Sequence, residues 1–293
     1  MKEQQDRLLR GTALQGRVRV FAALSTSLVE ELRRRHDAMP TATAAMGRTV
    51  TAAAMMGFML KGEEKLTVQV KGGGPIGQIV ADANADGEVR GYVSDPTVDL
   101  PLNPKGKLDV AGAVGTDGAL YVIKDLGLKE PYRGTSPIVS GELAEDFTYY
   151  FSVSEQTPSA VALGVLVDVD YSVKAAGGFI IQLLPGLHDD EITEIEHKLG
   201  RLPSVTTLID QGLGPEQIME RLFDDVKIMD TIPLTFACSC SQERVENTLV
   251  SLGKAELESI MRDAGRAEVS CHFCNEQYAV EKADLERLLH DIK

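Results

Sequence analysis

The sequence has no tryptophan, only 5% aromatic residues, and four cysteines among 293 residues. It also has no long apolar run. The segment AAAMMGFML, residues 52–60, ends at Lys61, far short of the roughly 20 residues that a membrane-spanning helix needs. The opening residues MKEQQDRLLRG contain no apolar stretch of the kind that marks a secretory signal. We therefore expect a cytoplasmic protein with no membrane partner, in which cysteines serve metal or redox chemistry more than permanent disulfides.

Positive charge is also scarce, with 30 Lys and Arg against 44 Asp and Glu and a formal net charge of −14. A surface this acidic repels nucleic acid phosphates and anionic lipids, so we predict no nucleic acid partner. The hydrophobic content of 43% is ordinary for a soluble globular protein with a real core. A chain of this length can hold two domains.

Short apolar or alternating segments, separated by Gly, Asn, Asp and Pro, dominate residues 17–186 and predict strands. Their short spacing favours antiparallel pairing. Helices are predicted at STSLVEELRRRH, with a capping box of Ser27 and Glu30, at the Ala- and Met-rich residues 41–60, and at residues 141–156. Residues 159–186 are predicted to form a final apolar hairpin. The interpretation is an α+β fold, whose N-terminal mixed α/β domain, residues 1–186, contains a largely antiparallel sheet.

An acidic region follows this domain. Residues 188–230 contain eleven Asp and Glu against four Lys and Arg, a net charge of −7. Apolar residues recur there at helical spacing, and Gly200, Gly212 and Pro215 punctuate them. We predict three short helices, each with one apolar and one acidic face, in a linker spanning residues 187–230. Two roles stay open for it: packing on the first domain, or a functional linker.

Two motifs in the first domain are decoys. GGGPIG, residues 72–77, fits the dinucleotide-binding pattern, but a strand-like segment follows where a helix should begin. DANADG, residues 82–87, resembles the start of a calcium loop, but Val93 stands where a bidentate Glu belongs. Both are predicted to be turns between strands. The five histidines form no catalytic set, and we expect no enzymatic activity and no catalytic residue.

All four cysteines lie near the end of the chain, as two pairs. CSC contains Cys238 and Cys240, CHFC contains Cys271 and Cys274, and thirty residues separate the pairs. Four thiolates form a tetrahedral zinc cage that leaves no open position for catalysis. We predict one zinc ion bound by these four residues in a small C-terminal domain, residues 231–293, with His272 as a bystander. Two alternatives are a thioredoxin-like redox pair and four incidental thiols.

The CxC and CxxC pairs, with YYFSVSEQTPSAVALGV and GGFIIQLLP, resemble the heat-shock protein thirty-three family of redox-regulated bacterial holdase chaperones. The resemblance implies the same three-part architecture. It also implies that oxidation releases zinc, unfolds the C-terminal region and exposes apolar surface for unfolding client proteins. The active form would be a homodimer that uses no ATP. Oxidation is expected to join Cys238 with Cys240 and Cys271 with Cys274, as the resemblance and short loop closure both favour.

Clients are expected to contact residues 188–230 after the zinc domain that covers them unfolds. Ile218, Leu222 and Phe223 would form part of the exposed stripe. Two other hypotheses remain at this point: a zinc-ribbon enzyme or nucleic-acid-binding protein, which the net charge opposes, and a structural zinc protein with no switch.

Overall fold

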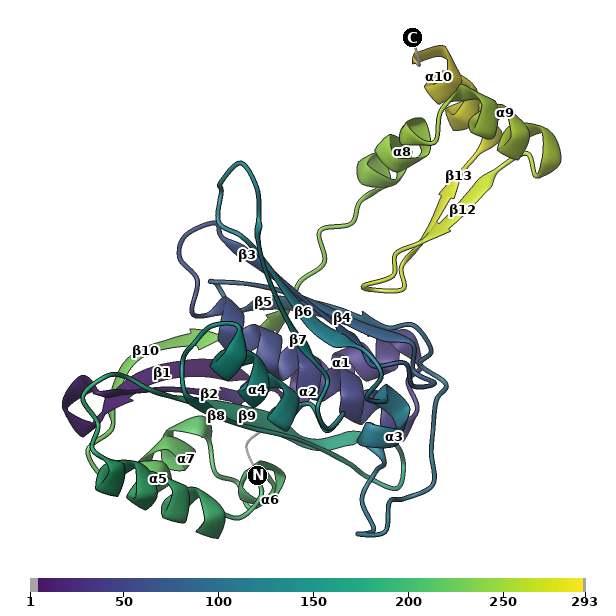
Figure 1. The fold of residues 1–293 in the computed structure, drawn as a ribbon. Coiled ribbons are helices and arrows are strands. Elements are labelled where there is room, and N and C mark those ends of the chain that lie inside the picture. Colours follow the sequence, from purple (N-terminus) through teal and green to yellow (C-terminus); the bar gives the residue numbers. More distant parts are fainter. Residues whose placement is uncertain (1–4, 292–293) are drawn as a thin grey trace. The chain divides into compact units, whose positions relative to one another are not determined.

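The structure, a computed structural model, describes residues 5–291. The chain divides into two compact units, the first ending at Ala237 and the second beginning at Cys238. Helices and mostly antiparallel sheets build the first unit, which confirms the predicted α+β class (Figure 1). The division into residues 1–186, 187–230 and 231–293 stays a prediction. Within the part of the chain that the structure describes, no helix combines the length and apolar character needed to cross a membrane.

The first unit contains a five-stranded antiparallel sheet in the order β10-β1-β2-β9-β8. The last two strands form the predicted apolar hairpin. The edge strand β10 was not predicted, and it returns from beyond the acidic region to pair with β1. The strands are β1 (Arg7–Ala13), β2 (Val18–Leu24), β8 (Ser159–Val167), β9 (Val173–Leu183) and β10 (Lys227–Pro233), and a short 3-10 helix, Leu14–Gly16, follows β1.

A second sheet has six strands in the order β11-β5-β4-β3-β6-β7. All neighbours are antiparallel except β11, which runs parallel to β5. GGGPIG connects β3 to β4, and DANADG contains the last residues of β4 and the predicted turn into β5. The strands are β3 (Lys65–Lys71), β4 (Gln78–Asn84), β5 (Glu88–Val93), β6 (Ala119–Asp125), β7 (Tyr132–Pro137) and β11 (Thr235–Phe236).

Helix α2 (Pro40–Gly57) packs against both sheets and forms the centre of the first unit. All of its residues except Arg48 are buried, which its many alanines and threonines allow. A Cβ atom added at Gly47 would lie 2.6 Å from Val29 Cγ1 and 2.7 Å from Val165 Cγ2. Only glycine therefore permits this approach between the helix and its neighbours. The other helices around this core are α1 (Thr26–His36), α3 (Val110–Val114) and α4 (Ala144–Val153).

The predicted start of α1 is wrong. Its N-cap is Ser25, so Ser27 lies inside the first turn. The Ser25 hydroxyl contacts Thr51 Oγ1 at 2.7 Å and makes no capping bond, whereas Asp6 Oδ2 accepts the backbone N–H of Leu28 at 2.7 Å. A distant carboxylate thus satisfies a donor at the helix N-terminus that the local sequence leaves open.

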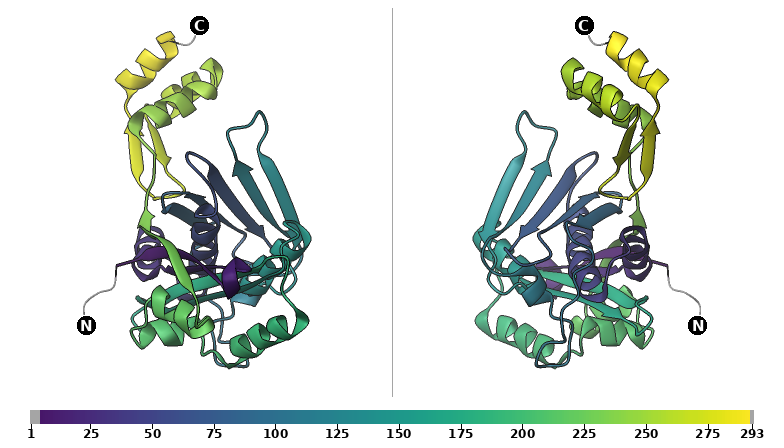
Figure 2. Two further views of the ribbon diagram at one scale, coloured as in Figure 1. Left: turned by 90° about the vertical axis from the view of Figure 1, so that its left-hand side faces the viewer. Right: turned by 90° about the vertical axis from the view of Figure 1, so that its right-hand side faces the viewer.

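The acidic region forms the three predicted helices, α5 (Asp189–Arg201), α6 (Val205–Asp210) and α7 (Pro215–Leu222). They lie on the face of the five-stranded sheet that points away from α2 (Figures 1 and 2). Their apolar stripe packs into one cluster with β1, β2 and β9. The expectation that the zinc domain covers this stripe is therefore corrected: the sheet of the first unit covers it. The helical residues buried in this cluster are Ile195, Val205, Leu208, Ile218, Met219 and Leu222, and Phe223, which is also buried there, directly follows α7.

The second unit is small. It consists of α8 (Gln242–Ser251), α9 (Lys254–Asp263), the hairpin of β12 (Ala267–Ser270) and β13 (Gln277–Val280), and α10 (Lys282–Asp291). The helices between the cysteine pairs match the prediction. Among the described residues of this unit, seven buried apolar residues form the core: Val245, Leu249, Leu257, Ala267, Val280, Leu285 and Leu288. A core of this size gives little stability by itself.

Candidate metal centre

The first cysteine pair begins where the chain leaves the first unit. Ala237 donates its backbone N–H to Val89 O at 3.0 Å, and Cys238 is the next residue. After Cys240, Ser241 caps α8 by accepting the backbone N–H of Arg244 at 3.2 Å. Within the second unit, the CSC segment therefore leads directly into the capped N-terminus of α8, which restricts the position of the Cys240 thiol.

The second pair lies in the turn between β12 and β13. Cys271 donates its backbone N–H to Glu276 O at 2.9 Å, and Asn275 donates its N–H to Cys271 O at 2.8 Å. Asn275 has φ +59°, a left-handed conformation that Asn adopts more readily than most residues. This tight turn directs the thiols of Cys271 and Cys274 to one side.

The four sulfurs lie within 4.8 Å of one another. Cys238 Sγ is 3.7 Å from Cys271 Sγ, and Cys240 Sγ is 3.2 Å from Cys274 Sγ. A zinc ion with four tetrahedral sulfurs at about 2.3 Å would space them about 3.8 Å apart. The observed cluster could hold a metal ion, and its sulfur donors suit zinc or another thiophilic metal. His272 is not part of the cluster.

The thiols differ in their acidity. Burial tends to raise the pKa of Cys238, but hydrogen bonds from the Cys240 backbone and the neighbouring thiols outweigh it and lower the pKa to about 7. Burial raises the pKa of Cys274 above its usual range. Cys238 therefore reaches the thiolate form, which binds metals and reacts with oxidants, near neutral pH.

A residue that sequence reasoning missed also contacts the cluster. The Tyr278 hydroxyl donates a hydrogen bond to Cys240 Sγ at 3.0 Å. Tyr278 lies in β13, opposite Val269 of β12, and both side chains are half-buried against the small core. The signal available in the sequence was an aromatic hydroxyl shortly after CHFC, in a segment that alternates as a strand.

The two decoy motifs form turns. Asn84 Oδ1 accepts the backbone N–H groups of Asp86 and Glu88 at 3.1 and 3.0 Å, which makes DANADG a side-chain-supported hairpin turn. GGGPIG passes close to the backbone of α3, because Gly74 donates its N–H to Val114 O at 2.9 Å. The glycines thus allow two backbone segments to pack closely. A strand, β4, follows them in place of the helix that a dinucleotide-binding motif needs.

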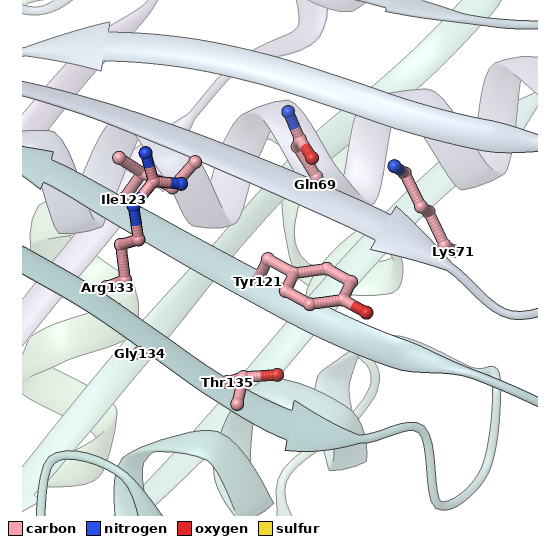
Figure 3. Close-up of a pocket in the computed structure, with 7 residues that line it drawn as sticks. All are labelled: Gln69, Lys71, Tyr121, Ile123, Arg133, Gly134 and Thr135. Atoms are coloured by element: carbon pink, nitrogen blue, oxygen red, sulfur yellow. The ribbon is translucent and has the colours of Figure 1, made fainter.

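A hollow of about 450 Å³ lies on the second sheet, over β3, β6 and β7 (Figure 3). No carboxylate, histidine or thiol is among its lining residues, so no group there is placed to activate Lys71, Tyr121 or Thr135 as a base or nucleophile. Its lining gives no reason to assign a reaction to this face. The lining residues are Gln69, Lys71, Tyr121, Ile123, Arg133, Gly134 and Thr135.

Comparison with known proteins gives consistent matches over nearly the whole chain. The family model described as Hsp33 protein matches residues 6–281. A relative from Brevibacillus brevis named 33 kDa chaperonin is 57% identical over 98% of this chain and 99% of the relative. One of the same name from Geobacillus kaustophilus is 54% identical over 97% of each chain. A crystal structure of the 33 kDa chaperonin (heat shock protein 33 homolog) from Thermotoga maritima superposes with TM-score 0.92, 42% identity and 98% coverage of both chains.

Proposed function

The chain belongs to the Hsp33 protein family, and on that premise we propose that it is a redox-regulated, ATP-independent holdase chaperone. The observation that carries the proposal is the cluster of four sulfurs within 4.8 Å, in a compact unit whose core has seven buried apolar residues among those that the structure describes. Such a unit depends on its metal, because structural zinc sites contribute apparent binding free energies of about 10–16 kcal/mol to folding.

In the reduced state, Cys238, Cys240, Cys271 and Cys274 would hold one zinc ion, which would crosslink the CSC segment to the β12–β13 turn. Four thiolate ligands leave no coordination position for a substrate, so the role of this centre is structural and regulatory. The relatives are named chaperonins, and we propose that this chain likewise has no catalytic activity.

Oxidation by a peroxide would remove the ligands. One thiolate sulfur attacks the O–O bond, forming a sulfenic acid and releasing hydroxide. A second thiolate attacks that sulfur, forming a disulfide and releasing the second oxygen as hydroxide, and the two hydroxides leave as water after protonation. Two peroxides are reduced for every four cysteines oxidised. The proposed products are the Cys238–Cys240 and Cys271–Cys274 disulfides.

Loss of the four ligands would unfold the second unit and expose its small apolar core. Clients would bind there and, as proposed, along residues 188–230. Because the stripe of α5–α7 packs on the five-stranded sheet, client binding by this stripe requires the helices to leave that sheet. Their departure would expose two apolar surfaces, the stripe and the sheet face, while the net charge of −7 on this region would keep a client complex soluble.

The remaining parts of the proposal follow from family membership. The active form would be a homodimer, and the protein would act in the cytoplasm on proteins that unfold under stress. Neither nucleic acid nor membrane is a proposed partner, since the formal net charge of −14 opposes binding to both.

The test combines zinc release with suppression of aggregation. Reduced protein should contain one zinc per chain and protect a thermally unfolding client poorly. Treatment with hydrogen peroxide should release the zinc and increase protection, without ATP. Protection that is equal before and after peroxide would instead indicate a structural zinc protein with no switch.

A further inference from the structure

Tyr278 directs its hydroxyl at one of the four sulfurs of the candidate metal centre. The oxygen is 3.0 Å from Cys240 Sγ, and the phenol O–H is the donor. This contact joins the two halves of the centre, because Tyr278 follows the second cysteine pair whereas Cys240 belongs to the first. Metal ligands are commonly held and tuned by such outer hydrogen bonds.

The position of Tyr278 is fixed by the hairpin. Tyr278 is paired with Val269, and its ring packs with Val269 against the core of the second unit. β12 continues directly into Cys271, and the turn is closed by the Cys271 N–H to Glu276 O bond of 2.9 Å. The strand pairing that positions Cys271 and Cys274 therefore also positions the hydroxyl donor for Cys240.

We propose that Tyr278 is a positioning residue that restrains the redox switch by protecting Cys240 from oxidation. The inference rests on the proposed zinc-thiolate function. A hydrogen bond to a thiolate stabilises the charge on sulfur and occupies a lone pair. The sulfur donates electron density to the peroxide oxygen as it attacks, so the hydrogen bond lowers its nucleophilicity and slows formation of the S–O bond. Cys240 would then react with peroxide later than the other cysteines, and another cysteine of the cluster would be oxidised first.

Tyr278→Phe tests this, because it removes the hydroxyl and keeps the ring that packs against the core. Ser270→Ala is the matched control. Ser270 Oγ donates to Gln277 Oε1 at 2.8 Å in the same hairpin, so this variant also loses one side-chain hydrogen bond but none to sulfur. Full zinc content and an unchanged circular dichroism spectrum in both reduced variants establish that they fold.

The first measurement is the rate of zinc release under peroxide. Tyr278→Phe should release zinc roughly threefold to tenfold faster than the unmodified protein, the range expected for the loss of one hydrogen bond of ordinary strength. Ser270→Ala should match the unmodified protein. The second measurement is site-resolved alkylation during oxidation, followed by mass spectrometry. The loss of free Cys240 thiol should be accelerated selectively in Tyr278→Phe, relative to the other three cysteines.

A third readout is spectroscopic. In cobalt-substituted protein, the sulfur-to-metal charge-transfer bands should shift in Tyr278→Phe and stay in place in Ser270→Ala, because Tyr278, unlike Ser270, donates a hydrogen bond to a ligand sulfur. Unchanged zinc release and unchanged Cys240 kinetics would overturn the inference. Equal acceleration at all four cysteines would also overturn it, since that result indicates a looser fold. An unmodified protein that binds no zinc, or keeps it under peroxide, would overturn the proposed function and this inference together.

Discussion

The Arg17 guanidinium forms a two-point ion pair with the Glu191 carboxylate, with Nη1–Oε2 at 2.6 Å and Nη2–Oε1 at 2.7 Å. The contact joins the start of β2 to the first turn of α5, and Glu191 also accepts the His188 N–H at 3.0 Å. The pairing holds the pKa of Glu191 below its ordinary value. At its far end, the region is attached by Arg7, which pairs with Glu216 of α7 at 2.6 Å. Ion pairs therefore attach helices α5 and α7 of the proposed client-binding region to the first unit, and apolar packing attaches the surface between them to the sheet.

The first prediction concerns this packing. Phe223 is 3% exposed and belongs to the apolar cluster between the three helices and the sheet. Phe223→Ala should weaken that attachment by about 3–5 kcal/mol, the usual cost of such a truncation in a packed cluster. Hydrogen exchange across residues 188–230 should accelerate in the reduced protein, with zinc content unchanged. Met229→Ala is the control, because Met229 is 62% exposed on the neighbouring strand β10.

The same measurement tests the proposed client surface. Oxidised unmodified protein should lose protection across residues 188–230 as it gains chaperone activity. If protection from hydrogen exchange there is unchanged while aggregation is fully suppressed, clients bind to another surface. A loss of zinc in Phe223→Ala would mean that Phe223 supports the second unit as well as the first.

The second prediction concerns metal binding. Cys240→Ser and Cys271→Ser should each lose most of the bound zinc, because each leaves three thiolates and a weak hydroxyl donor. His272→Ala should retain one zinc per chain, since His272 lies outside the sulfur cluster. Metal analysis of purified reduced protein measures both outcomes. Full zinc retention in either serine variant would contradict the four-cysteine site.

The third prediction concerns the disulfides. Sulfur contacts of 3.7 and 3.2 Å join the two pairs, Cys238 with Cys271 and Cys240 with Cys274, whereas the proposed disulfides lie within each pair. We expect the within-pair products, because closing a short loop costs little chain entropy once the unit unfolds. Peptide mapping after complete oxidation decides between them. Cys240 joined mainly to Cys274 or Cys271 would show that the folded contacts, rather than the unfolded chain, select the partners.

The fourth prediction concerns pH. Burial raises the pKa of Asp6 from 3.8 to about 6, although the Leu28 backbone N–H opposes the shift. The folded state thus binds this proton more tightly than the unfolded state does. The stability that the proton confers is complete below about pH 4 and is lost as the pH rises through about 6. Asp6→Asn should lack this dependence.

Calorimetric unfolding between pH 4 and 7 measures the effect. As the pH rises over that range, the free energy of unfolding of Asp6→Asn should increase relative to that of the unmodified protein by up to about 3 kcal/mol, because the pKa of Asp6 rises from 3.8 to about 6 on folding. Asp95→Asn is the control. Hydrogen bonds from the Thr97 side chain and backbone lower the pKa of Asp95, so its stabilising effect is lost only as the pH falls below about 4, and the difference between Asp95→Asn and the unmodified protein should stay nearly constant from pH 4 to 7. A constant difference between Asp6→Asn and the unmodified protein would contradict the assignment to Asp6.

Much of the local structure followed from the sequence, because its causes are local. Apolar spacing predicted α5, α6 and α7, and the Gly, Asn and Asp turns predicted the hairpins between β3, β4 and β5. The closeness of the four sulfurs was expected from two short cysteine pairs that were the only cysteines in the chain. The resemblance to the Hsp33 family, confirmed by the comparisons, supplied the chaperone function, which these local patterns do not contain.

The tertiary structure decided which surfaces meet. β10, with the sequence KIMDTIP, is exposed at nearly every position, so no alternation of buried residues marked it as a strand. Its partner β1 lies more than 200 residues earlier, and only the folded chain brings the two together. Asp6 at the start of α1 and Tyr278 beside Cys240 were missed for the same reason. Periodicity identifies the apolar face of α5–α7, but the sheet that covers this face is chosen by packing between distant segments, which spacing along the chain does not encode.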